Sequence, residues 1–130
     1  MTPTQNDSPS AAAKAILIVE DEHPLSHALE MKLKANGYAP KVVTNGQEAL
    51  KELENGKYAL MLLDLIMPIM DGFGVLQEME NKKLKTPVIV LSNLGQDEDR
   101  AKAKTFGVLD YFVKSNTPIA AIIERVKAVA

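Results

Sequence analysis

The sequence predicts a doubly wound α/β fold, in which five parallel strands alternate with five helices that cover both faces of the sheet. Three observations support this prediction. Short apolar runs recur along the chain and are typical of buried strands, apolar residues between them follow helical spacing, and the connections are short. Right-handed crossovers would then bring the carboxyl ends of the strands to one edge of the sheet.

Apolar runs predict the positions of the strands. Residues Ala15–Val19, 59–63 and 88–91 are apolar throughout, which suits strands that are buried on both faces. Residues 38–44 form a weaker strand, and Pro40 favours an edge position because it cannot donate a hydrogen bond to a neighbouring strand. Residues 109–113 complete the set.

Helices are expected at about residues 24–36, 46–55, 72–81, 96–106 and 118–129. Asn45 and Glu48 form a capping box at the second helix, and Thr117 is expected to cap the fifth helix, with Pro118 as its first residue. Three glycines predict helix ends: Gly37, Gly56 and Gly107. The fourth helix has few apolar side chains, so we expect it to bury the least surface and to move most easily.

Composition limits the classes of protein. The 130 residues fit one domain, at residues 14–130, after a disordered tail at residues 1–13 that is rich in Thr, Pro, Asn and Ser. The chain has no cysteine, which excludes disulfides and thiolate metal sites. A net charge of -2 argues against direct binding of nucleic acid, and no apolar run is long enough to span a membrane. We expect a cytoplasmic protein.

Polar side chains follow four of the predicted strands. Glu20 and Asp21 follow the first strand, Asp64 the third, Ser92 the fourth and Lys114 the fifth. Ligands of open parallel sheets bind beyond the carboxyl ends of the strands, so we expect these side chains to converge. Three clustered carboxylates repel one another unless a cation lies among them, and a set of oxygen ligands favours Mg²⁺.

A phosphoryl group would suit this arrangement. Mg²⁺ and Lys114 can offset its negative charge, and Ser92 can donate a hydrogen bond to it. Asp64 is then the expected nucleophile, because carboxylates form aspartyl phosphates.

These residues, in this order, resemble the receiver domain of two-component response regulators. The motif residues are Glu20, Asp21, Asp64, Pro68, Asp71, Gly72, Ser92, Tyr111 and Lys114. Each motif alone is weak, but the complete series is specific, and the resemblance covers about residues 15–129. It implies a flavodoxin-like (βα)5 fold with the strand order 2-1-3-4-5.

The resemblance also implies the chemistry of the site. Asp64 would accept a phosphoryl group from a histidine kinase or a phosphotransfer protein. Asp21, Asp64 and the Ile66 carbonyl would bind Mg²⁺ directly, and Glu20 would act through water. Such a domain is a switch that catalyses its own phosphotransfer and a slow autodephosphorylation, not an enzyme for a separate substrate. We expect slow hydrolysis because Ile66 and Leu94 are apolar and cannot position a water molecule.

The expected switch involves Ser92 and Tyr111. Ser92 would move toward the phosphoryl group, and Tyr111 would then turn inward to fill the space beneath the fourth helix. By the resemblance, the fourth helix, fifth strand and fifth helix would form the face that binds a downstream protein, in a monomer or a phosphorylation-dependent dimer.

Two positions depart from the commonest receiver pattern. Asn93 follows Ser92, where a small residue is usual, and Ser115 follows Lys114, where proline is usual and the preceding bond is often cis. A cis bond before Ser115 would cost roughly 3 kcal/mol. The sequence leaves open whether the bond between Lys114 and Ser115 is cis or trans.

Other functions are less compatible with the residues. A flavin- or nucleotide-binding protein of this fold would need a phosphate-binding loop after the first strand, but Glu20, Asp21 and Glu22 would repel a phosphate there. An interaction module that is never phosphorylated would not require the intact set of acids, hydroxyl and lysine. His23 and His27 are four residues apart, but no further nitrogen or sulfur ligand is evident, so we expect solvated surface residues.

Overall fold

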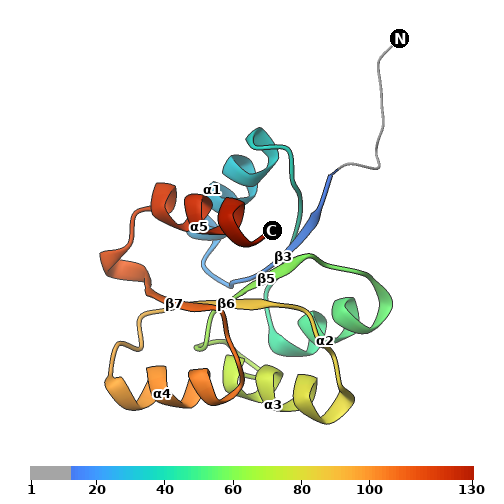
Figure 1. Cartoon of the computed structure of the whole chain (residues 1–130), viewed down its shortest axis with the longest axis vertical. Coiled ribbons are helices and arrows are strands. Elements are labelled where there is room, and N and C mark those ends of the chain that lie inside the picture. Colours follow the sequence, from blue (N-terminus) through green and yellow to red (C-terminus); the bar gives the residue numbers. More distant parts are fainter. Residues whose placement is uncertain (1–12) are drawn as a thin grey trace.

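A computed structural model describes residues 13–130, and almost all of the predicted tail lies outside the described residues. Its centre is a parallel sheet with the strand order β4-β3-β5-β6-β7, which confirms the predicted order (Figure 1). The strands are β3 (Ala15–Val19), β4 (Ala39–Val43), β5 (Leu60–Leu63), β6 (Val88–Ser92) and β7 (Asp110–Val113).

Helices cover both faces of the sheet, as predicted. They are α1 (His23–Ala35), α2 (Gly46–Asn55), α3 (Gly72–Lys82), α4 (Asp97–Thr105) and α5 (Ile119–Val129), and a 3-10 turn, η1 (Lys114–Asn116), follows β7. α1 and α5 lie on one face, whereas α2, α3 and α4 lie on the other (Figure 1). No helix within residues 13–130 has both the length and the apolar character needed to cross a membrane.

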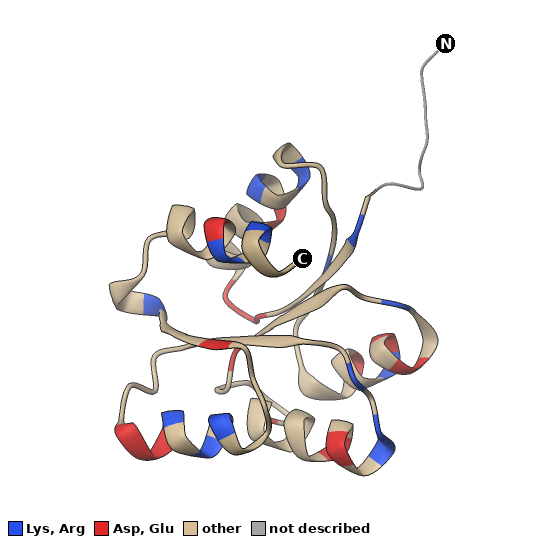
Figure 2. Ribbon diagram, in the orientation of Figure 1, with Lys and Arg blue, Asp and Glu red and all other residues tan. Residues whose placement is uncertain are grey.

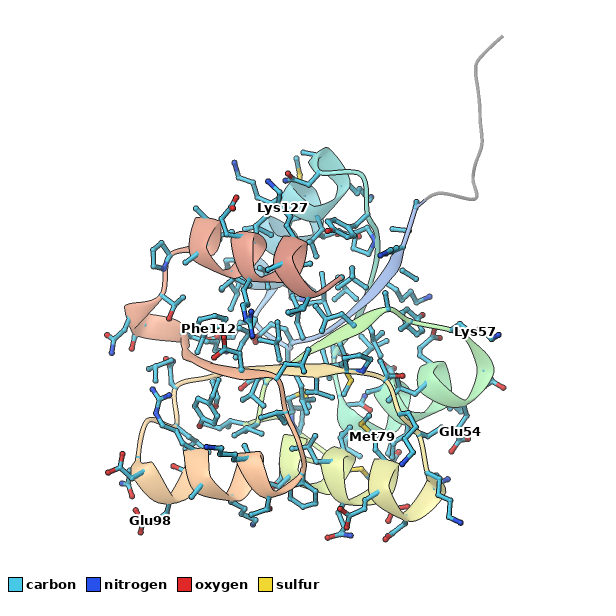
Figure 3. The ribbon with its side chains drawn as sticks, viewed as in Figure 1. Glu54, Lys57, Met79, Glu98, Phe112 and Lys127 are labelled. Atoms are coloured by element: carbon cyan, nitrogen blue, oxygen red, sulfur yellow. The ribbon has the colours of Figure 1, made fainter. Side chains whose placement is uncertain are left out.

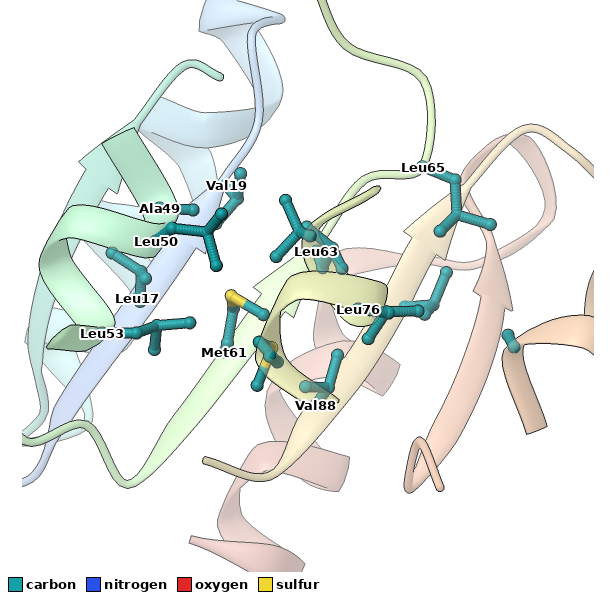
Figure 4. Packing of buried hydrophobic residues seen from close by; sticks show 14 of the residues in the cluster. Leu17, Val19, Ala49, Leu50, Leu53, Met61, Leu63, Leu65, Leu76 and Val88 are labelled. Carbon is teal, nitrogen blue, oxygen red and sulfur yellow. The ribbon is translucent and has the colours of Figure 1, made fainter. Parts of the chain in front are cut away.

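The alternation of side chains along the strands divides the core into two layers. Leu17 and Met61 point toward α2 and α3 (Figure 4), whereas Ile16 and Leu62 pack with residues of α1 and α5. Met79 lies on the inner side of α3, while charged side chains such as Glu98 project outward (Figure 3). Apolar burial on both faces therefore fixes the strands whose ends carry the polar residues.

The structure confirms the predicted cap of α2 but not that of α5. Asn45 Oδ1 accepts a hydrogen bond from Glu48 N at 3.0 Å, and Glu48 Oε1 accepts one from Thr44 N at 3.3 Å. The prediction that Thr117 caps the last helix is wrong, because its hydroxyl donates to the Val113 carbonyl at 2.9 Å. Thr117 instead follows the turn η1 as its C-cap residue, and α5 begins two residues later.

α4 is held by little buried surface. Ala103 is its only buried residue. Acidic residues occupy its first turn and lysines its last, as the red and blue bands of Figure 2 show. This arrangement complements the helix dipole, which favours negative charge at the amino end and positive charge at the carboxyl end. The expectation that this helix buries the least is confirmed.

Candidate functional site

Asp64 lies directly after β5 and is only 3 % exposed. Its amide donates to the Val19 carbonyl at 3.0 Å, and its Oδ1 accepts a hydrogen bond from Ile66 N at 3.1 Å. Gly72, the first residue of α3, packs so closely that a Cβ atom there would lie 2.6 Å from the Asp64 carbonyl oxygen. The strand, the following loop and the start of α3 together fix this carboxylate at the edge of the sheet.

Lys114 forms ion pairs with two of the predicted acidic residues and with Glu22. Its Nζ atom lies 3.0 Å from Asp64 Oδ2, 2.8 Å from Glu20 Oε1 and 2.7 Å from Glu22 Oε1. The lysine side chain is 9 % exposed, so its ammonium group is largely withdrawn from water. The prediction that strand ends 50 residues apart in sequence converge is therefore confirmed for Asp64 and Lys114.

Burial and charge act in opposite directions on this cluster. Burial raises the pKa of Glu20, and the nearby charge of Asp64 adds to this effect, whereas the hydrogen bond from Lys114 lowers it. Burial alone would lower the pKa of Lys114, but its hydrogen bonds to Glu20, Glu22 and Asp64 outweigh that effect and raise the pKa above its ordinary value. Lys114 therefore stays an ammonium ion, held by carboxylates.

The carboxylates also form a group that could hold a metal ion. One oxygen each from Glu20, Asp21 and Asp64 lie within 4.8 Å of one another. A pocket of about 230 Å³ opens beside them and is lined by Asp21, Glu22, Asp64, Ile66, Asn93 and Lys114. Oxygen ligands facing water suit Mg²⁺, which keeps several water molecules when it binds proteins. The residues present therefore fit the ion that the sequence predicts.

Ser92 and Tyr111 both contact the loop that follows β6. Ser92 is fully buried, and its Oγ accepts a hydrogen bond from Leu94 N at 3.3 Å. The Tyr111 hydroxyl donates to the Leu94 carbonyl, and the side chain is already buried. The ring therefore lies inward in this structure, and the rotation of Tyr111 on phosphorylation stays a prediction. Arg100 of α4 lies over the ring, 4.9 Å from its centroid.

Two features of the site were missed by the sequence analysis. Glu22 received no role of its own, although its place beside the acidic pair at the start of α1 was a signal. Asn93 and Ser115 were treated as separate departures, but Asn93 Oδ1 accepts a hydrogen bond from Ser115 N at 3.0 Å. The bond between Lys114 and Ser115 is trans.

Comparisons with known proteins agree with this geometry. The family model for the response regulator receiver domain matches residues 16–127. The transcriptional regulatory protein ResD of Bacillus subtilis is 38% identical over 87% of this chain and 46% of its own length. The alkaline phosphatase synthesis regulator PhoP of the same species is 33% identical over 89% of this chain and 48% of its own. The chain thus spans about half the length of these curated relatives.

Solved structures show the same similarity. The receiver domain of a Francisella response regulator superposes with a TM-score of 0.83 at 28% identity, covering 89% of this chain and 95% of that one. The response regulator TrrA of Thermotoga maritima, solved in complex with Mg²⁺ and BeF, gives a TM-score of 0.76 at 32% identity, covering 90% of this chain and 99% of that one.

Proposed function

Because the chain belongs to the family of response-regulator receiver domains, we propose that Asp64 is its phosphoacceptor. The observation that carries this proposal is the approach of Lys114 Nζ to Asp64 Oδ2 at 3.0 Å, beside an open pocket. A buried carboxylate that faces both a fixed cation and solvent can receive a phosphoryl group. The donor is the phosphohistidine of a histidine kinase or of a phosphotransfer protein.

The transfer needs positioning and charge stabilisation from this chain. An oxygen of Asp64 forms a bond to phosphorus, and the bond from phosphorus to the donor nitrogen breaks, with its electrons returning to the imidazole. Lys114 then pairs with the phosphoryl oxygens in place of the carboxylate, because the Asp64 carboxyl loses its negative charge when it is phosphorylated. The domain thereby catalyses its own phosphotransfer and, with water as nucleophile, a slow autodephosphorylation.

Mg²⁺ would be held directly by the carboxylates of Asp21 and Asp64 and by the Ile66 carbonyl, while Glu20 would act through water. When bound, it would offset the negative charge of the phosphoryl oxygens. The cluster of three carboxylates supports this assignment, and so does the complex of the related TrrA with Mg²⁺ and BeF.

The phosphoryl group would act through Ser92 and Leu94. If Ser92 Oγ turns toward a phosphoryl oxygen, the Leu94 amide loses its acceptor, and the hydrogen bond from Tyr111 to Leu94 must adjust. Arg100, which stacks on Tyr111, carries the change to α4. The face formed by α4, β7 and α5 would then bind a downstream protein in the cytoplasm, as a monomer or as a dimer formed on phosphorylation.

Intact-mass measurement with acetyl phosphate and Mg²⁺ tests the phosphoacceptor. Asp64→Asn should abolish the added phosphoryl mass. Asp71→Asn is the matched control, because an asparagine retains the Oδ1 acceptor that caps α3 at 2.8 Å from Gly74 N, and it should be labelled like wild type. Labelling of Asp64→Asn at the wild-type rate would refute the assignment. Chelation of Mg²⁺ should stop labelling of the wild type.

A further inference from the structure

The turn that carries Lys114 is capped by a side chain from a distant part of the sequence. Ser115 is the second residue of η1, so its N–H group has no acceptor within this short helix. The preceding Val113 has no side-chain acceptor to offer. Asn93, from the loop after β6 and 22 residues earlier in the chain, accepts this hydrogen bond through Oδ1 at 3.0 Å.

Asn93 and its two neighbours in the sequence take part in three hydrogen bonds. Its neighbours on either side are Ser92, whose Oγ accepts from Leu94 N, and Leu94, whose carbonyl accepts from Tyr111. Its own side chain lines the pocket with Asp64 and Lys114. The residue therefore connects the loop that responds to Ser92 with the turn from which the lysine side chain departs.

We propose that Asn93 is a positioning residue for Lys114. The hydrogen bond from Ser115 N holds the peptide that joins Lys114 to Ser115, and this peptide sets where the lysine side chain leaves the backbone. A displacement of residues 92–94 is then transmitted to the lysine directly. The inference deepens the proposed function, since the advantage of a fixed lysine rests on phosphorylation of Asp64.

Hydrogen exchange of the Ser115 amide tests the bond without phosphorylation. In wild type this amide should be protected, and Asn93→Ala should remove the protection. Asn93→Asp keeps an oxygen acceptor at the same place and should restore it. The matched control is Asn116→Ala in the same turn, because no hydrogen bond of the Asn116 side chain occurs within residues 13–130. An unprotected Ser115 amide in wild type would overturn the proposal.

The position of Lys114 provides the second measurement. The ¹³Cε and ¹⁵Nζ shifts of Lys114 should change in Asn93→Ala and stay at wild-type values in Asn116→Ala. The rate of labelling by acetyl phosphate at saturating Mg²⁺ should fall by about three- to tenfold in Asn93→Ala, the range expected for one hydrogen bond. Urea denaturation establishes that both variants are folded.

The outcomes separate this inference from the proposed function. If wild type is not labelled at Asp64, the proposed function fails, while the Ser115 exchange and the Lys114 shifts still decide whether Asn93 positions the lysine. If Asn93→Ala loses Ser115 protection but keeps the Lys114 shifts and the labelling rate, the bond is only structural and the positioning role is overturned.

Discussion

Glu22 Oε1 lies 2.7 Å from Lys114 Nζ, and Glu22 is the only exposed member of the three carboxylates that hold this ammonium group. Its side chain is 60 % exposed, whereas the side chains of Glu20 and Asp64 are almost fully buried. Water can therefore replace Lys114 at Glu22 more readily than at the other two. Glu22 is the partner that Lys114 can leave at the least cost when a phosphoryl group arrives.

Glu22→Gln should therefore speed phosphorylation. The substitution removes a charge that competes for Lys114 and that repels anionic donors at the mouth of the pocket. We expect the labelling rate with acetyl phosphate to rise by about fivefold at most, the upper range for an exposed ion pair. Glu54→Gln is the control, because Glu54 is likewise an exposed glutamate that pairs with a lysine, Lys82, at 2.6 Å. A slower rate in Glu22→Gln would show that this glutamate assists the reaction.

Lys114→Met should bind Mg²⁺ more tightly than wild type while losing phosphorylation. Without the ammonium group, the acidic cluster has no internal cation and gains more from the metal. The labelling rate should fall on the order of 100-fold, as for other groups that stabilise developing charge. The affinity is measured from the thermal unfolding temperature at increasing Mg²⁺ concentrations, with Lys57→Met as the control. Weaker Mg²⁺ binding in Lys114→Met would contradict the charge argument.

Ile66→Asn should speed loss of the phosphoryl group. Ile66 lines the pocket beside Asp64 and is 53 % exposed, whereas Leu94 packs against the core. An amide at position 66 can position the hydrolytic water, which is worth about tenfold at most in rate. The decay of the phosphorylated mass after donor removal measures this, and Ile69→Asn in the same loop should decay like wild type. Equal decay of both variants would rule out shielding by Ile66.

Gly72→Ala should destabilise the fold and disturb the site together. The new methyl group would lie 2.6 Å from the Asp64 carbonyl oxygen and 2.7 Å from Leu65 Cα, so backbone must move. We expect a loss of roughly 1–3 kcal/mol in urea denaturation and a changed Asp64 amide shift. At Gly56 the nearest atoms lie at 3.4 Å, so Gly56→Ala should leave the Asp64 shift unchanged.

Tyr58 predicts a loss of stability at alkaline pH. Burial, followed by its hydrogen bond to Glu52, raises the pKa of Tyr58 to about 12. An unfolded tyrosine ionises near pH 10, so between about pH 10 and 12 the unfolded state releases its proton first and the free energy of unfolding falls. Tyr58→Phe should remove this part of the pH dependence, as measured by urea denaturation at several pH values. An unchanged pH dependence would show that Tyr58 ionises normally.

The sheet was predictable because its signals are strong and local. The continuous apolar runs at β3, β5 and β6 left few alternatives to buried strands. The observed bounds of these strands differ from the predicted ones by about one residue. The start of α5 was not predictable in the same way, because the Thr117 hydroxyl can cap a helix or bond to the Val113 carbonyl. Which of these it does depends on the path of the turn before it.

The same distinction between predictable and unpredictable features applies to the site. Asp64, Lys114 and the acidic pair meet because the ends of parallel strands share one edge, which follows from topology alone. The pairing of Asn93 with Ser115 depends on the course of two loops, and the inward position of Tyr111 depends on side-chain packing. Neither leaves a periodic signal in the sequence.

The charge pattern of α4 makes this helix sensitive to its solvent. Asp97, Glu98 and Asp99 lie in its first turn and Lys102 and Lys104 in its last, while Ala103 alone is buried. Salt screens such interactions, with a screening length of about 8 Å at physiological ionic strength, whereas it does not screen apolar burial. Added salt therefore weakens this electrostatic contribution to the helical stability of α4, whereas helices stabilised mainly by apolar burial are affected less.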